Sequence, residues 1–329
     1  MAQNTAASTV HDVIVVGSGA GGGTVTKVLA DLGVSVLLME AGPMLNIGDL
    51  KEHMWPYNVP HRGAGPKGEA YSGRPTGFTY SATYGGAQLP GEPYTVAPGS
   101  DFSWFRSRIL GGRTNHYGRV TLRFADYDFK PKTRDGLGFD WPISYEDLAP
   151  YYDKAEEFIG VTGTVEKIRS APDGIFNTPG ALKAHDVLVQ RSCAKLNIRA
   201  VPSRQAVTTR ERNGRAPCHY CGQCGRGCMT ASNYASSYVQ IFPAMKTGRV
   251  QVLANAMARE LITDESGKVT AVSYIDKSDG SEKQVRCRTV VLSASACESA
   301  RLLLNSKSSR HAGARPQVTV LVAPRGSPP

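Results

Sequence analysis

The sequence predicts an α/β fold, and three features near the N-terminus lead to this prediction. The run from His11 to Val16 is nearly continuous in β-branched residues, which is typical of a buried parallel strand. The glycine-rich turn Gly17–Gly23 follows at once, and apolar residues at helical spacing then extend from Thr24 to Leu32. A second buried strand, Val34–Met39, completes a strand–helix–strand unit.

The glycine-rich turn carries a dinucleotide-binding fingerprint. Gly17, Gly19 and Gly22 have the spacing G-x-G-x-x-G, with Ser18 between the first two. The first glycine permits the tight turn, the second lets a diphosphate approach the backbone, and the third lets helix and strand pack closely. Glu40, after the second strand, is placed to accept hydrogen bonds from ribose hydroxyls. These features predict a Rossmann-like domain and leave NAD and FAD both open.

The rest of the chain alternates between irregular, helical and strand-like stretches. Residues 41–118 are rich in Gly, Pro and Tyr and show little regular pattern, which is typical of a segment that wraps a ligand. Ser144 and Asp147 form a capping box for a helix that continues to Gly160. The remaining predicted elements are a helix over Ala181–Leu196, strands over Val250–Leu253, Ala258–Thr263, Val269–Ile275 and Thr289–Ser293, and a short helix over Cys297–Leu304.

Composition and charge exclude several classes of protein. Hydrophobic residues make up 41% of the 329 residues, as in a globular protein, and no apolar run is long enough to span a membrane. The first ten residues lack the features of a secretory signal, so a cytoplasmic location is expected. The net charge of +10 comes partly from basic residues around the cysteines and partly from the C-terminal tail. Neither stretch interleaves its basic residues with aromatics, so no nucleic-acid partner is expected.

Four of the seven cysteines lie close together in the sequence. Cys218, Cys221, Cys224 and Cys228 have the spacing of a bacterial ferredoxin run, although Met229 replaces the usual proline. In a reducing compartment such a group indicates metal or redox chemistry before disulfides. The spacing leaves three interpretations open, namely an iron–sulfur cluster, structural zinc, and no metal at all.

Several motifs in order resemble the glucose–methanol–choline (GMC) oxidoreductases, and most closely their bacterial FAD-dependent sugar and alcohol dehydrogenases. They are GSGAGGG, MEAGP, ILGGRTNHYG, WPISYEDLAPYYDKAEEFIG and VVLSASACESARLLLNS, and the likeness runs from about His11 to Lys307. The resemblance implies a GMC-type FAD-binding domain with part of a substrate, or cap, domain. It also implies three-cysteine iron–sulfur ligation like that of some FAD sugar dehydrogenases, through Cys218, Cys224 and Cys228.

The resemblance assigns FAD contacts to particular residues. Glycines 17, 19 and 22 would line the diphosphate, and Glu40 would hold the ribose. A second glycine turn would run past the diphosphate and the flavin ring, and the backbone around Ala256 and Ala258 would meet the adenine. The turn Ala294–Ala296 would be a second FAD-facing turn, although Ser295 stands where glycine is usual. The second glycine turn contributes Gly111, Gly112, Thr114, Asn115 and His116.

The resemblance also implies oxidation of a CH–OH group of an alcohol or sugar, with hydride transfer to flavin N5. An external acceptor, a cytochrome or a quinone, would then take the electrons. The family's base is a histidine near the C-terminus, paired with a second His or an Asn. None of the chain's seven histidines has that context, so the catalytic residues are unknown; these are His11, His53, His61, His116, His185, His219 and His311.

These observations predict a chain organised around one domain. Residues 1–310 would form the FAD-binding domain, and 306–329 an irregular tail whose abrupt change of composition indicates a frameshift or an early end. We therefore expect the N-terminal part of a longer enzyme. Within the domain, the fingerprint would occupy 11–40, FAD-covering loops 41–120, a partial cap with the cysteines 121–248, and returning strands 249–305.

Two other functions stay open beside the dehydrogenase. The chain could be a catalytically inactive module that binds FAD or transfers electrons through flavin and iron–sulfur groups. The fingerprint is also compatible with an NAD-dependent enzyme. Identification of the bound nucleotide and a test for alcohol-dependent dye reduction separate these three alternatives.

Overall fold

The structure is a computed structural model that describes residues 9–50, 55, 85–86, 89, 92–100, 102 and 104–306. The expected tail beyond Ser306 and the histidines at 53, 61 and 311 lie outside these residues. The described chain forms two compact units. The first takes the chain up to His116, Gly225–Gly227 and the chain from Ala235 onward, and the second consists of Tyr117–Cys224 and Cys228–Tyr234.

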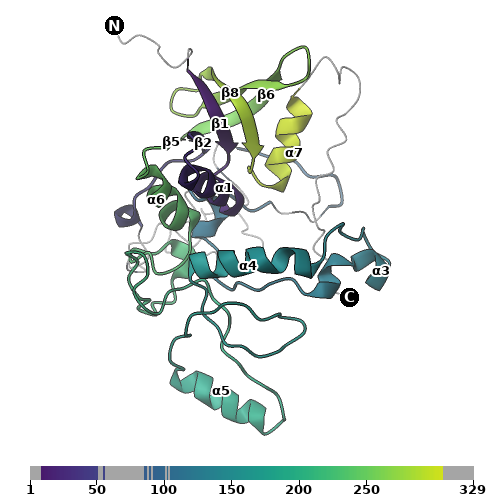
Figure 1. The fold of residues 1–329 in the computed structure, drawn as a ribbon, viewed down its shortest axis with the longest axis vertical. Coiled ribbons are helices and arrows are strands. Elements are labelled where there is room, and N and C mark those ends of the chain that lie inside the picture. Colours follow the sequence, from purple (N-terminus) through teal and green to yellow (C-terminus); the bar gives the residue numbers. More distant parts are fainter. Residues whose placement is uncertain are drawn as a thin grey trace. The chain divides into compact units, whose positions relative to one another are not determined.

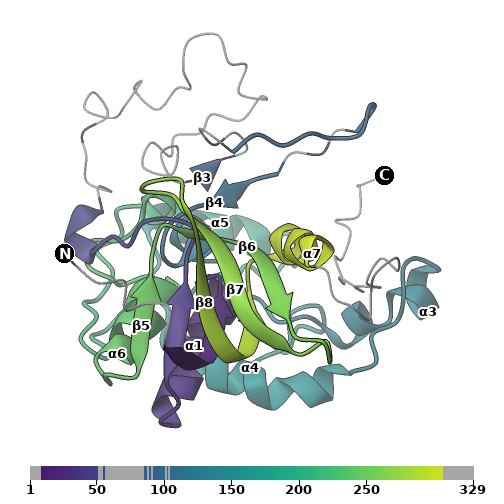
Figure 2. The same cartoon turned by 90° about the horizontal axis from the view of Figure 1, so that it is seen from above.

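A six-stranded mixed sheet organises the first unit (Figures 1 and 2). Its order is β5-β2-β1-β8-β7-β6, and the first four strands run parallel. The last two strands continue antiparallel, with β7 between β8 and β6. The strands are β1 Val10–Val16, β2 Val36–Met39, β5 Val250–Leu253, β6 Ala256–Thr263, β7 Val269–Asp276 and β8 Glu282–Leu292.

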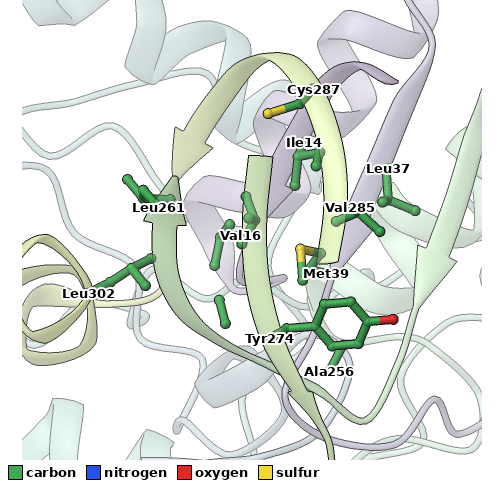
Figure 3. Packing of buried hydrophobic residues seen from close by; sticks show 12 residues of the cluster. Ile14, Val16, Leu37, Met39, Ala256, Leu261, Tyr274, Val285, Cys287 and Leu302 are labelled. Carbon is green, nitrogen blue, oxygen red and sulfur yellow. The ribbon is translucent and has the colours of Figure 1, made fainter. Parts of the chain in front are cut away.

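Both faces of the central strands are buried, which explains their nearly continuous apolar sequence. Val15 and Leu38 contribute to a core on the face that packs with α1 (Ala20–Asp31) and α6 (Phe242–Met245). The alternate residues, Ile14 and Leu37 among them, point into the other core, which includes Leu302 of α7 (Ala296–Asn305). Figure 3 shows this second cluster, with Leu302 reaching from α7 toward the strands.

The elements of the first unit confirm the predicted α/β class, although several bounds differ from those expected, most of all in α1 and β8. Helix α1 begins at Ala20, inside the glycine run, rather than at Thr24, because Gly19 already serves as its N-cap. Strand β8 begins at Glu282 rather than near Thr289. Its first half alternates exposed polar and buried residues, and antiparallel pairing with β7 makes that half a strand. A two-stranded ladder of β3 (Gly85–Gly86) and β4 (Arg106–Ser107) was not predicted.

The second unit contains α3 (Pro131–Asp135), α4 (Tyr145–Ile159) and α5 (Ala184–Ala194). The predicted cap of α4 is confirmed, since Ser144 Oγ accepts from the Asp147 amide at 3.3 Å and the Asp147 carboxylate accepts from the Ser144 amide at 2.8 Å. Helix α5 lies inside its predicted range, although none of its residues is buried. Across the described residues, no helix has both the length and the apolar character that a membrane crossing requires.

Candidate functional site

The glycine fingerprint folds into a tight turn between β1 and α1. Gly17 has φ +95°, and a Cβ there would lie 2.5 Å from the Ser293 carbonyl oxygen. A Cβ on Gly22 would overlap the carbonyl oxygen of Gly17, so the helix can approach the strand only with glycine there. A Cβ on Gly19, in contrast, would meet no atom within 4 Å. The first and third glycines thus serve packing, and the second leaves open space at the start of α1.

Ser18 and Glu40 connect the fingerprint to the second strand. Ser18 is fully buried, and its hydroxyl donates to Glu40 Oε2. The Ser18 amide lies 3.3 Å from the same oxygen, and the Gly42 amide donates to Glu40 Oε1 at 2.9 Å. A carboxylate has about four lone-pair positions, so these bonds leave acceptor capacity for ribose hydroxyls. Glu40 therefore fixes the turn, and its role toward a ribose stays a prediction.

Burial determines the acid–base behaviour of Glu40. Removal from water raises the pKa of its carboxyl, while the bonds from Ser18 and Gly42 and the charge of Arg108 oppose that rise. The carboxyl therefore takes up a proton at a higher pH than an ordinary glutamate does. Protonation would remove part of its capacity to accept hydrogen bonds from a ribose.

The second glycine turn contacts the first. A Cβ on Gly112 would lie 3.5 Å from Gly19 Cα, and the Gly111 amide donates to the Ser18 hydroxyl at 2.8 Å. Gly111 itself has φ +93°, a left-handed conformation that favours glycine. The structure thus brings together the two glycine turns, more than ninety positions apart, as the resemblance implies.

The polar side chains of the second turn mainly hold its backbone. Thr114 Oγ1 donates to the Gly111 carbonyl at 2.5 Å. The Asn115 side-chain amide donates to the carbonyls of Leu110 and Gly112, each at 3.0 Å. His116 Nδ1 lies 3.4 Å from the Gly225 carbonyl oxygen. Thr114, Asn115 and His116 therefore hold the backbone of the turn in place, in addition to the FAD contacts predicted for them.

Sequence reasoning missed Ser236, which is fully buried at the centre of this arrangement. Its amide donates to Thr114 Oγ1 at 3.0 Å, and its hydroxyl donates to the Ser18 carbonyl at 2.6 Å. It immediately precedes a π-helical turn, Ser237–Ile241, and packs where Gly23 lacks a side chain. No motif marks this serine, and its contact with Ser18 spans 218 positions.

The C-terminal segments reach the same turn from the other side. A Cβ on Gly17 would lie 2.8 Å from Ala294 Cα, so Ala294 borders the fingerprint. Ser295 has φ +77° and ψ 167°, a conformation found almost only in glycine. The Ala256 amide donates to the Glu40 carbonyl at 2.9 Å, and the Ala258 carbonyl accepts from Arg301 at 2.7 Å. The Ala258 carbonyl thus already has a partner in the protein.

The four clustered cysteines lie in the second unit. None of the chain's seven cysteines forms a disulfide. The amide of Tyr220 lies 3.3 Å from the Cys218 sulfur, and that of Gln223 lies 3.4 Å from Cys221. Burial raises the pKa of the Cys218 thiol, and the three neighbouring thiols raise it further. Within the described ranges, no three or more His, Cys, Asp or Glu side chains are grouped to hold a metal ion.

Two buried arginines hold the segments around these cysteines by main-chain carbonyls. Arg119 is fully buried and donates to the carbonyls of Cys224 at 2.5 Å and Tyr234 at 2.7 Å. Arg215, from the basic stretch, donates to the carbonyls of Ala231 at 2.9 Å and Ser232 at 3.1 Å. At least one of the basic residues around the cysteines, Arg215, therefore serves to hold the main chain in place.

The sheet and the glycine turn define an α/β protein of the dinucleotide-binding class. The sequence model of the GMC oxidoreductases matches residues 11–318, and the chain belongs to this family. The match extends past Lys307, where the resemblance was expected to end. GMC oxidoreductases bind FAD, so the family favours FAD over NAD.

Named relatives are dehydrogenases and oxidases. The chain is 27% identical to the fructose dehydrogenase large subunit of Gluconobacter japonicus, over 91% of this chain and 55% of that protein. It is 32% identical to 2-methyl-1,2-propanediol dehydrogenase of Mycolicibacterium austroafricanum, over 91% of this chain and 51% of that protein. The 6'''-hydroxyparomomycin C oxidase of Streptomyces lividus is 29% identical to it, over 92% of this chain and 51% of that protein. The chain thus spans about half the length of these relatives.

Two solved structures share the fold. A formate oxidase of Aspergillus oryzae, solved in a study of its FAD modification, superposes with a TM-score of 0.54 at 15% identity, over 92% of this chain and 50% of that one. Pyridoxine 4-oxidase of Mesorbium loti superposes with a TM-score of 0.53 at 18% identity, over 90% of this chain and 52% of that one. At these identities the likeness concerns the fold alone, and it confirms the predicted Rossmann-like, GMC-type fold.

Proposed function

We propose that the chain binds FAD at the two glycine turns and forms the flavin-binding part of an oxidoreductase that acts on CH–OH groups of an alcohol or sugar. Bound FAD supplies the hydride acceptor, at N5 of its ring, for this oxidation. The observation that carries the proposal is the open space at Gly19, beside a buried network of Ser18, Glu40 and Gly111. The named relatives, which are sugar and alcohol dehydrogenases and oxidases, support the substrate class.

The chain's own residues would hold the adenosine half of the cofactor. The first amides of α1, next to Gly19, would donate to the diphosphate, because the first turn of a helix has N–H groups without intrahelical partners. Glu40 would accept from the ribose, and Gly112, which lacks a side chain beside Gly19, would leave the space there to the ligand. The proposal assigns no general base, since no described histidine has the family's catalytic context.

The cysteines enter this proposal only as a metal site to be tested. The spacing of Cys218, Cys221, Cys224 and Cys228 predicts iron–sulfur ligation. Their side chains do not fit a metal site in this structure, because within the described residues no group of three or more ligands converges. No electron-transfer step is therefore routed through them. Iron and zinc analysis of anaerobically purified protein tests the three interpretations, and a protein without either metal would rule out ligation.

The electron acceptor and the location also stay predictions. An external cytochrome or quinone follows from the family resemblance, and a cytoplasmic location follows from the N-terminal composition. Dye-linked assays with each class of acceptor test the first prediction, and cell fractionation tests the second.

The decisive experiment combines binding and turnover. The full chain is incubated with FAD, freed of unbound flavin, and examined by absorption spectroscopy before sugars or alcohols and an artificial dye are added. FMN serves as the matched ligand control, since it lacks the adenosine half that the site is proposed to hold. We expect retained FAD, no retained FMN, and donor-dependent dye reduction.

The alternatives predict different results in the same experiment. Retained FAD without any dye reduction would favour the catalytically inactive binding module. Failure to retain FAD under all conditions would refute the proposed function. In a parallel incubation with NAD, retention of NAD in place of FAD would support the NAD-dependent enzyme, against the family.

A further inference from the structure

Arg108, which precedes the second glycine turn, pairs with two carboxylates from distant parts of the first unit. Its Nε donates to Glu92 Oε2 at 2.7 Å, and its Nη2 donates to Glu298 Oε1, in the first turn of α7. The side chains are largely buried, at 14%, 10% and 9% exposure for Arg108, Glu92 and Glu298. Charges this far from water interact more strongly than surface pairs and fix geometry more tightly.

Each of these carboxylates has a further cation of its own. Lys277 Nζ lies 2.6 Å from Glu92 Oε1, and Arg301 Nε lies 2.6 Å from Glu298 Oε2. Arg301 then donates through Nη2 to the Ala258 carbonyl of β6 at 2.7 Å. Two ion pairs and a hydrogen bond therefore connect Arg108 through α7 to β6, the strand expected to face the adenine.

The backbone of Arg108 lies against the segment that follows Glu40. A Cβ on Gly42 would overlap the carbonyl group of Arg108, so the two segments are in direct contact. Two residues further on, the Leu110 amide donates to the Pro43 carbonyl at 2.9 Å. The charge of Arg108 also acts on Glu40, since it lowers the pKa that burial raises.

We propose that Arg108 is a positioning residue of the FAD site, which holds the Gly111 turn in place against the segments that carry Glu40 and Ala258. This inference rests on the proposed function, because it concerns the same site. Arg108 acts through its neighbours and needs no contact of its own with the cofactor. The guanidinium suits this role, because its donors lie in a rigid planar fork that fixes the directions of both carboxylates, whereas the ammonium of a lysine is a flexible point charge.

Removal of Arg108 should affect binding more than folding. Glu92 would retain Lys277, and Glu298 would retain Arg301, so neither carboxylate would be left buried without a cation. What the substitution breaks is the connection between the two pairs. The expected signature is weaker FAD binding by a protein that still folds.

The test is a fluorescence titration of the apo form of the full chain with FAD. We expect Arg108→Met to weaken binding about tenfold or more, and Arg108→Lys to lie between it and the wild type. Arg301→Met, which cuts the link to Ala258, should weaken binding in the same direction. Arg288→Met is the matched control, because Arg288 forms a 2.7 Å pair with Asp12 at the surface, and it should leave binding unchanged.

A pH series supplies a readout that a purely structural role would not move. Arg108 is the charged group that acts on Glu40, whose other partners are Ser18 and the Gly42 amide. In Arg108→Met the loss of FAD affinity on acidification should therefore begin at a higher pH than in the wild type. An unchanged pH profile would contradict the inference.

The outcomes separate this inference from the proposed function. If the wild type retains no FAD, the proposed function and the inference both fail. If the wild type binds FAD and folded Arg108→Met binds it within about twofold, only the inference fails. Should Arg108→Met not fold, Glu298→Gln replaces it, since this isosteric variant breaks the same connection, and normal FAD binding by it would overturn the inference.

Discussion

Ser295 adopts a backbone conformation that strains any residue except glycine, and the chain should become more stable when glycine replaces it. Its φ of +77° with ψ of 167° is almost exclusive to glycine. The residue is the N-cap of α7, but its side chain makes no capping hydrogen bond. The family resemblance likewise implies glycine here. Ser295→Gly thus removes strain without removing a bond to the helix.

The expected gain follows from two opposing terms. Conformations of this kind cost about 1–3 kcal/mol in a residue with a Cβ. A glycine in the unfolded chain loses more backbone freedom on folding, which costs about 0.5–1 kcal/mol. The free energy of unfolding should therefore rise by about 1 kcal/mol, which corresponds to a thermal midpoint about 2–4 °C higher.

Urea and thermal denaturation followed by circular dichroism measure this change. Ser295→Ala is the matched control, because it removes the hydroxyl and keeps the Cβ, and it should be no more stable than the wild type. If Ser295→Gly were no more stable than Ser295→Ala, the strain assigned to this position would be wrong. A gain in both variants would point to the hydroxyl instead of the backbone.

Two further predictions concern buried charge. FAD affinity should begin to fall on acidification at a higher pH than for a site with an ordinary glutamate, because burial raises the pKa of Glu40 and its protonated form accepts less well. Titrations with FAD over a pH series check this, and Glu40→Gln should bind FAD weakly and with little of this pH dependence. Arg123→Met should destabilise the second unit by about 3 kcal/mol in urea denaturation, because it leaves Glu156 buried without its 2.5 Å partner. The double variant Arg123→Met/Glu156→Leu should recover most of that loss, and no recovery would show that another contact of Arg123 matters more.

The local parts of the fold could be predicted because their signals are local. The apolar run of β1, the glycine spacing at Gly17 and the capping box at Ser144 each lie within a few residues. Such patterns depend on periodicity and backbone conformation, which the residue order alone determines. They predicted the Rossmann-like start of the chain and helix α4.

The parts that could not be predicted depend on contacts between distant segments. Ser236 joins the site through a hydrogen bond to Ser18 across 218 positions, and Arg108 reaches Glu298 across 190. No periodicity reports such pairs, because each partner looks like an ordinary polar residue in its own sequence context. The first half of β8 was missed for a related reason, since only its pairing with β7 makes a polar stretch a strand.

The central claim is that the open space at Gly19 receives the diphosphate of FAD, and one comparison tests it most directly. The Cβ of Gly19→Val would have no protein atom within 4 Å, and the same holds for the Cβ of Gly48→Val, at a glycine outside the site. Equilibrium titration with FAD should show binding by the wild type and Gly48→Val, and a loss of about a hundredfold or more in Gly19→Val, whose apo form should still unfold in a cooperative transition. Normal FAD binding by folded Gly19→Val would contradict the account.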